Sequence, residues 1–123
     1  MEGIGMAHEG DPHHPILERP WEYEIIELCY HNDPGDWRKS HVDLTLRRGE
    51  AVRRLRFLAP QDFEVERGCF PRPTGGMCIL DVRHRQLEEI GVRVADFEGS
   101  HGAVTFWARE VIDLEDRTAG GSP

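Results

Sequence analysis

Two short segments in the last third of the chain, residues 92–97 and 103–108, each alternate between apolar and polar side chains. An alternation of period two is typical of a β-strand that has one face in a core. The residues between the two segments include Gly99 and Gly102, which suits a hairpin loop. The sequence therefore predicts an antiparallel hairpin around which the other strands assemble.

The length of this loop also predicts which residues lie opposite one another. If residue 97 pairs with residue 103, Val94 faces Phe106 on the core side of the hairpin, and Arg93 lies opposite Trp107 on the other side. An arginine over an exposed indole ring forms a cation–π pair worth about 0.5–1 kcal/mol. The register thus predicts an Arg93–Trp107 stack outside the main core.

The second face of the hairpin is the best apolar candidate for a binding surface. It carries Arg93, Phe97, Thr105 and Trp107. Large aromatic side chains outside a core must either be covered by the rest of the chain or bind something. We expect one of two outcomes. Either the first strand or the proline-rich segment 68–76 covers these aromatic side chains, or they bind another protein.

Five further segments and a C-terminal one have strand character, bounded by turn residues. They are residues 22–31, 41–48, 52–58, 62–67 and 77–82, and the segment that contains Val111, Ile112 and Leu114. The last segment either extends the strand before it or restarts beyond a bulge near Glu110. Ile25 and Ile26 are adjacent, so we expect the first strand to be buried on both faces.

The spacing of these segments predicts a mainly β fold. We expect a single-domain antiparallel β-sandwich or strongly curled sheet of seven or eight short strands, with at most one short helical turn near residues 83–90. With 123 residues the chain is sized for one domain. We expect a disordered N-terminal tail over residues 1–15, the β-rich domain over residues 16–116, and a disordered C-terminal tail over residues 117–123.

The charge of the chain restricts its partners. The formal net charge of −8 argues against nucleic-acid binding, which depends on phosphate neutralisation. Residues 1–37 contain nine acidic residues against Arg19 alone, whereas residues 38–58 contain seven basic residues against Asp43 and Glu50. Charge complementarity between neighbouring strands explains this asymmetry most simply.

The cysteines and the apolar runs bear on where the protein is found. The chain has three cysteines with no C-x-x-C spacing and starts without a basic, apolar leader, so we expect a cytoplasmic protein. No apolar run approaches the roughly 18 residues of a membrane span, so we expect no membrane association.

Arginines on the predicted 41–58 hairpin are the best polar candidates. Arg47, Arg54 and Arg56 form a stripe whose guanidinium groups suit carboxylates or phosphates, which predicts an anion-binding site. Residues 79–85 superficially resemble the second nucleotide-binding motif of the PilZ family, although Arg83 replaces its serine and no R-x-x-x-R occurs. A small-ligand or nucleotide sensor that uses this stripe is therefore the alternative function.

Sequence motifs of the common enzyme classes are absent, and the histidines form no H-x-H pair. An enzyme is the second alternative, in which His31, His41, His84 or His101 assembles in space with carboxylates. We expect no metal site and no cofactor.

Short runs across residues 21–114 resemble small β-rich bacterial domains, some of which are assigned as immunity proteins of toxin systems. The runs are Leu55-Arg56-Phe57, Ile79-Leu80-Asp81, Val92-Arg93-Val94-x-Asp96-x-Glu98 and Phe106-Trp107-Ala108. The resemblance implies a non-enzymatic protein that acts by binding another protein. An acidic surface suits a basic, nuclease-like partner, because complementary charge accelerates encounter.

Overall fold

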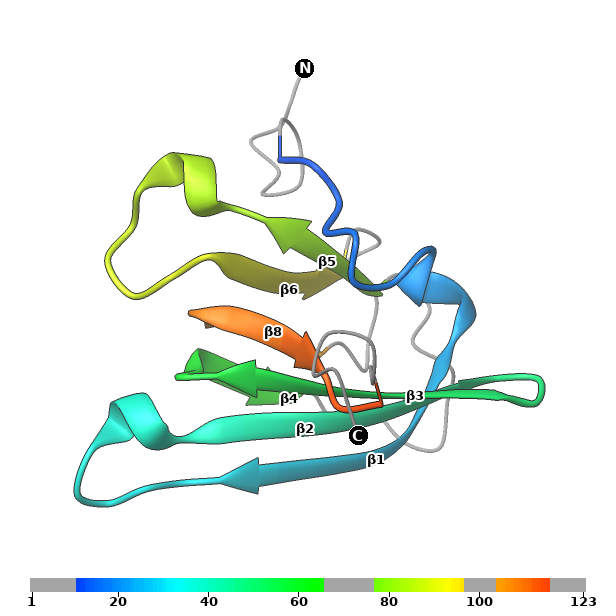
Figure 1. The fold of residues 1–123 in the computed structure, drawn as a ribbon, viewed down its shortest axis with the longest axis horizontal. Helices are drawn as coiled ribbons and strands as arrows, with labels where there is room; N and C mark the ends of the chain where they lie inside the picture. The colour runs from blue at the N-terminus through cyan, green and yellow to red at the C-terminus, as the bar shows by residue number, and fades with distance from the viewer. Residues whose placement is uncertain (1–10, 66–76, 97–103, 116–123) are drawn as a thin grey trace.

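The computed structural model describes residues 11–65, 77–96 and 104–115. These residues form two antiparallel sheets of four strands, ordered β1-β2-β3-β8 and β4-β7-β6-β5 (Figure 1). The predicted antiparallel fold of short strands is confirmed. The first sheet contains β1 (Glu24–His31), β2 (His41–Arg48), β3 (Ala51–Leu58) and β8 (Glu110–Asp113). The second contains β4 (Gln61–Val65), β5 (Met77–Asp81), β6 (Val92–Asp96) and β7 (Val104–Ala108).

The core lies between the two sheets, because alternate residues of each strand point inward. Leu44 and Phe57 from the first sheet and Val94 and Phe106 from the second are fully buried. The rings of Phe57 and Phe106 meet edge to face, with centroids 5.0 Å apart. Burial of a large apolar side chain contributes about 1.5–3 kcal/mol, so these contacts hold the two sheets together.

The β6–β7 hairpin has the register that the loop length predicts. Val94 pairs with Phe106, and Arg93 pairs with Trp107. Residues 97 and 103, from which the register was deduced, lie outside the described residues. The pairing therefore places Arg93 and Trp107 on the outer face of the second sheet.

The expected two-sided burial of the first strand is wrong. The register of β1 on β2 shifts between Ile25, which pairs with Leu46, and Glu27, which pairs with Thr45. Ile26 is the extra residue of this irregularity, and its side chain is 44% exposed. Two adjacent isoleucines therefore reflect a bulge on an edge strand, which also discourages pairing with another chain.

The final strand changes sheet. β7 ends at Ala108 in the second sheet, and β8 starts at Glu110 in the first, with Arg109 between them. The backbone N–H of Arg109 donates to the carbonyl of Leu58 at 2.7 Å. Of the two alternatives that the sequence left open, the strand therefore restarts, and it does so against β3.

Helical structure among the described residues is limited to short 3₁₀ turns. These are η1 (Pro20–Glu22), η2 (Trp37–Lys39) and η3 (Arg83–Arg85). The helical turn expected near residues 83–90 is thus a single turn, which ends where Gln86 adopts a left-handed conformation with φ of 58°.

Residues 11–14, which we expected in a disordered tail, run along β5 instead. The N–H of His14 donates to the carbonyl of Ile79 at 2.8 Å, and the N–H of Asp81 donates to the carbonyl of Pro12 at 2.8 Å. β5 is an edge strand of its sheet and offers backbone groups that composition does not reveal. Residues 1–10 of the predicted N-terminal tail and the whole predicted C-terminal tail, residues 117–123, lie outside the described residues.

Four connections between strands lie at the same end of the sandwich, which we call the loop end. It consists of residues 32–40, 59–60, 82–91 and Arg109. Figure 1 shows the β1–β2 and β5–β6 connections at the left, and the β2–β3 turn at the right. No helix among the described residues is long and apolar enough to cross a membrane.

Candidate binding surfaces

The outer face of the second sheet holds the stack that the sequence predicts. The guanidinium carbon of Arg93 lies 4.2 Å from the centroid of the Trp107 ring, and that of Arg85 lies 5.9 Å from it. Trp107 and Thr105 are half-buried. Phe97, the fourth residue of this predicted surface, lies outside the described residues. The cation–π pair is therefore present, and a second arginine from η3 accompanies it.

Much of this face belongs to a second, smaller core. Trp107 packs with Ile90 against a buried cluster of apolar side chains. The members of the cluster are Cys78, Leu80, Val82 and Ala95. The apolar surface available to a partner at Trp107 is reduced accordingly, and the assignment of this face to protein binding stays a prediction.

Arg93 is half-buried on this face. Burial lowers the pKa of Arg93 from its ordinary value, with a smaller lowering contribution from Arg85. Its Nε is buried and finds no hydrogen-bond acceptor in the described part of the chain. Asp11, whose side chain is 3% exposed, instead accepts from Arg85 at 2.6 Å and lies 3.1 Å from Nε2 of His84. The residues 11–14 are thus tied to η3 by the carboxylate of Asp11.

The arginine stripe is neutralised by carboxylates. Arg56 on β3 donates to both carboxylate oxygens of Asp43, the facing residue on β2, at 2.8 and 2.9 Å. Hydrogen bonds from Arg56 lower the pKa of Asp43 and thereby favour its charged form. The other two arginines pair more loosely, Arg47 with Glu24 at 3.5 Å and Arg54 with Glu115 at 3.4 Å. Of these three pairs, Arg47–Glu24 joins the acidic and basic segments as predicted, whereas Asp43 belongs to the basic segment itself and Glu115 follows β8.

Two of the four candidate histidines meet. His31 and His41 face each other on β1 and β2, with ring centroids 5.0 Å apart and planes inclined by 18°. Burial, with a contribution from Arg56, lowers the pKa of His41. His84 lies elsewhere, next to Asp11, and His101 is outside the described residues. Within the described ranges no group of three or more His, Cys, Asp or Glu side chains could hold a metal ion.

The loop end presents exposed apolar side chains that no sequence pattern predicts. Trp37 in η2 and Leu87 after η3 are each 40% exposed. Trp37, Arg38, Gln61, Glu88 and Glu89 surround a cavity of about 210 Å³. Glu88 has no ion-pair partner among the described residues, whereas Glu89 pairs with two arginines.

Short-range hydrogen bonds fix the loop that carries Trp37. A carboxylate oxygen of Asp33 accepts from the N–H groups of Gly35 at 2.9 Å and Asp36 at 3.1 Å. Asp36 in turn accepts from the N–H of Arg38 at 3.1 Å and caps η2. The side chain of the buried Ser40 accepts from the N–H of Asp33 at 2.9 Å. The position of Trp37 is therefore determined by the turn chemistry of its own loop.

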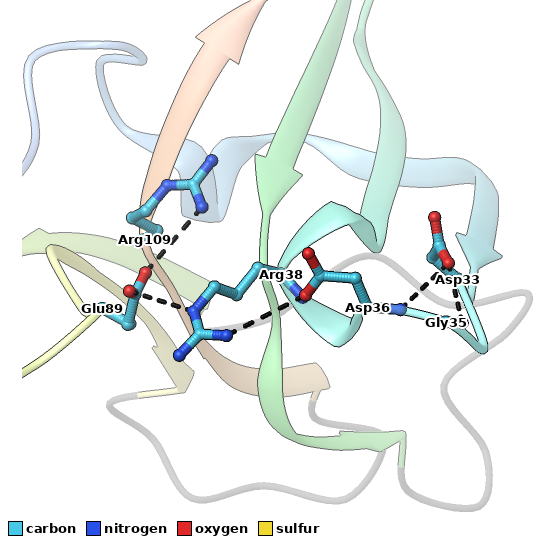
Figure 2. A network of polar contacts seen from close by, with 6 residues as sticks. All are labelled: Asp33, Gly35, Asp36, Arg38, Glu89 and Arg109. Atoms are coloured by element: carbon cyan, nitrogen blue, oxygen red, sulfur yellow. Dashed lines mark hydrogen bonds and ion pairs between the residues drawn. The ribbon is translucent and has the colours of Figure 1, made fainter.

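Ion pairs then connect this loop to the other side of the loop end. Figure 2 shows a continuous series of contacts from Arg109 through Glu89 and Arg38 to Asp36. Nε of Arg38 donates to Glu89 at 3.2 Å, and Arg109 approaches the other oxygen of Glu89 at 3.9 Å. The guanidinium of Arg38 also lies 5.3 Å from the centroid of the Trp37 ring. Three connections of the sandwich are thus joined at the base of the exposed indole.

Backbone strain concentrates in the same region. Ala59, Gln86 and Glu89 in the loop end and Asp62 just beyond it have positive φ values, between 53° and 62°. Such conformations cost a non-glycine residue about 1–2 kcal/mol and tend to cluster at functional sites. Arg19 is the remaining described non-glycine residue with a positive φ. The loop end therefore combines exposed apolar residues, fixed geometry and strain.

Comparisons with known proteins give no match, whether the chain is compared with protein families, curated proteins or solved structures.

Proposed function

We propose that this chain is a non-enzymatic protein-binding module, immunity-like in its mode of action, which contacts its partner through the loop end. The observation that carries the proposal is the 40% exposed Trp37 on a loop that hydrogen bonds and ion pairs hold in place. Tryptophan is the residue type most enriched among those that dominate interface energies. A rigid loop loses little conformational entropy on binding, so a fixed tryptophan is well suited to this role.

The charge of the whole chain favours a partner with a basic surface. The chain as a whole has a net charge of −8, whereas the loop end itself carries five basic against four acidic side chains. Glu88 lies beside Trp37 and has no ion-pair partner among the described residues. Complementary charge increases the rate of encounter and disfavours partners of like charge. An immunity-like role on this surface would consist of blocking a basic, nuclease-like protein.

The other predicted surfaces fit this role less well. Arg93 covers the ring of Trp107 at 4.2 Å, so a partner would have to displace a guanidinium to reach the indole. Arg47, Arg54 and Arg56 all have carboxylate partners, which a phosphate ligand would have to replace. The guanidinium of Arg38 lies 5.3 Å from the centroid of the Trp37 ring, farther than Arg93 lies from Trp107, and a partner at Trp37 displaces no cross-strand ion pair.

Quantitative affinity capture from the source cells tests the proposal, with the wild-type chain, Trp37→Ala, Trp107→Phe and Val52→Ala as baits. Val52 is 47% exposed next to the β2–β3 turn, at the opposite end of the sandwich, and serves as a matched control. The captured protein is then purified and its Kd measured for each variant. Loss of a central tryptophan costs about 2 kcal/mol or more, so we expect Trp37→Ala to weaken binding by roughly 30-fold or more.

Three results would bear on this experiment. Unchanged binding of Val52→Ala and Trp107→Phe, together with loss in Trp37→Ala, supports the loop end. Loss in Trp107→Phe with full binding of Trp37→Ala would move the interface to the outer face of the second sheet. Equal binding by all four baits would contradict both locations.

A further inference from the structure

A cavity separate from the loop end lies between the N-terminal segment and η1. Its volume is about 510 Å³, and among the described residues its lining comes from segment 13–21. Cavities that hold small-molecule ligands measure about 300–1,000 Å³. This cavity is therefore large enough for a small organic molecule.

The walls of the cavity suit a planar apolar group. Leu17 and Pro20 are buried and form apolar parts of the lining. Trp21 and His13 contribute aromatic rings with centroids 5.6 Å apart and planes inclined by 58°. Rings inclined in this way can contact a third ring by edge and face, which is a favourable aromatic geometry.

The lining also carries one charge of each sign. Glu18 and Arg19 are both exposed, so the formal charge of the lining is zero with the histidines neutral. Among the described residues, the carboxylate paired with Arg19 is that of Glu22, at 3.8 Å, which is too long for a hydrogen bond. The guanidinium of Arg19, with its side chain 61% exposed, is thus available for a closer carboxylate.

The backbone that presents Arg19 is strained. Arg19 has φ of 54° and ψ of 57°, a left-handed conformation that costs a residue with a side chain about 1–2 kcal/mol. Glycine would adopt it without this cost. The carbonyl of Arg19 accepts from the N–H of Glu22 at 3.0 Å, so the strained residue starts η1, and its side chain lines the cavity.

The segment around the cavity is held firmly from two sides. His14 is hydrogen-bonded to β5, and its Nδ1 accepts from the N–H of Ile16 at 3.1 Å. Arg53 on β3 donates to the carbonyl of Ile16 at 3.0 Å and to Asp113 at 2.5 Å. The cavity is therefore formed before any ligand arrives.

We propose that this cavity binds a free aromatic amino acid. The ligand's ring lies against Trp21 and His13, its carboxylate accepts from the guanidinium of Arg19, and its ammonium group pairs with Glu18. A ligand with both charges complements a lining that contains one carboxylate and one guanidinium. Binding of this ligand is independent of the protein-binding function proposed for the loop end.

Titration of the ¹⁵N-labelled full chain with three related compounds tests the proposal. The compounds are L-phenylalanine, 3-phenylpropionate, which lacks the ammonium group, and phenethylamine, which lacks the carboxylate. The signal followed is the indole N–H of Trp21, assigned from the spectrum of Trp21→Phe. We expect a saturable shift of this signal with L-phenylalanine. The other two compounds should bind at least roughly tenfold more weakly than L-phenylalanine, because each lacks one charged hydrogen bond.

Arg19→Gly separates binding from folding. Glycine relieves the left-handed strain, so this variant should melt at a higher temperature than the wild type while its affinity for L-phenylalanine falls to that of phenethylamine. No saturable shift with any compound up to its solubility limit would overturn the proposal. Equal affinity for L-phenylalanine and phenethylamine, or unchanged affinity in a well-folded Arg19→Gly, would also overturn it.

Discussion

Replacement of Gly91 by alanine probes how the loop end is attached to the two sheets. The N–H of Gly91 donates to the carbonyl of Ala108, and its carbonyl accepts from the N–H of Val82, both at 2.9 Å. A Cβ atom at this position would lie 2.6 Å from the carbonyl oxygen of Arg109 and 3.1 Å from Cγ of Arg83. The first neighbour is backbone and cannot rotate away, so the strands must separate locally.

The size of the effect follows from this geometry. Insertion of a methyl group into a packed site usually costs about 1–3 kcal/mol, and a contact of 2.6 Å with backbone belongs at the upper part of that range. We expect Gly91→Ala to lower the free energy of unfolding by about 2–3 kcal/mol. For a domain of this size that corresponds to a fall of roughly 10 °C in melting temperature.

Urea unfolding followed by tryptophan fluorescence measures the effect, with two other glycines as references. Gly49 has φ of 61° and open space around it, so Gly49→Ala should cost about 1 kcal/mol through backbone strain alone. A Cβ at Gly35 would meet only Asp33 Oδ1 at 3.5 Å, so Gly35→Ala should change stability by less than about 0.5 kcal/mol.

The order of the three variants decides the result. Destabilisation in the order Gly91→Ala, Gly49→Ala, Gly35→Ala supports the described attachment. A Gly91→Ala variant as stable as Gly35→Ala would refute it.

Three further predictions concern individual side chains. Burial lowers the pKa of His14, so the unfolded chain takes up a proton at higher pH than the folded chain, and the free energy of unfolding falls as the pH drops below 6.5. His14→Asn keeps a hydrogen-bond acceptor and should reduce this pH dependence, as measured by urea unfolding at a series of pH values. Burial raises the pKa of Cys78 to about 11, so iodoacetamide should label the exposed Cys29 but not Cys78 in the folded protein, as read by peptide mass spectrometry. A double-mutant cycle on Asp43 and Arg56 should give a coupling of about 0.5–1 kcal/mol that decreases with salt.

Each of these has a clear contrary outcome. An unchanged pH slope in His14→Asn would mean that this imidazole is not responsible for the loss of stability at low pH. Equal labelling of both cysteines would contradict the burial of Cys78. A coupling of zero would mean that the Asp43–Arg56 ion pair does not contribute to the free energy of unfolding.

The strands could be predicted because burial on one face leaves a period of two in the sequence. The alternation of Val42, Leu44 and Leu46 predicts residues 41–48, and β2 occupies those residues. The register of Arg93 on Trp107 followed from the loop length alone. A bulge cannot be predicted in this way. The additional residue Ile26 shifts the alternation, so the residues after it point to the opposite face from the one that a period of two predicts.

The candidate site was less accessible to sequence reasoning. Trp37 stands between Asp36 and Arg38 with no periodic pattern, so its exposure is visible only once the loop is folded. Arg38 and Glu89 are far apart in sequence, and nothing in either segment predicts their contact. The left-handed conformation of Gln86 could not be predicted either, because the residue type does not indicate it, whereas a glycine would.

Hydrogen exchange of the chain, free and bound to its captured partner, tests the central claim most directly. If the loop end is the interface, slowed amide exchange should concentrate in residues 32–40 and 82–91. Protection confined to β6 and β7 around Trp107, with no change in residues 32–40, would contradict the claim.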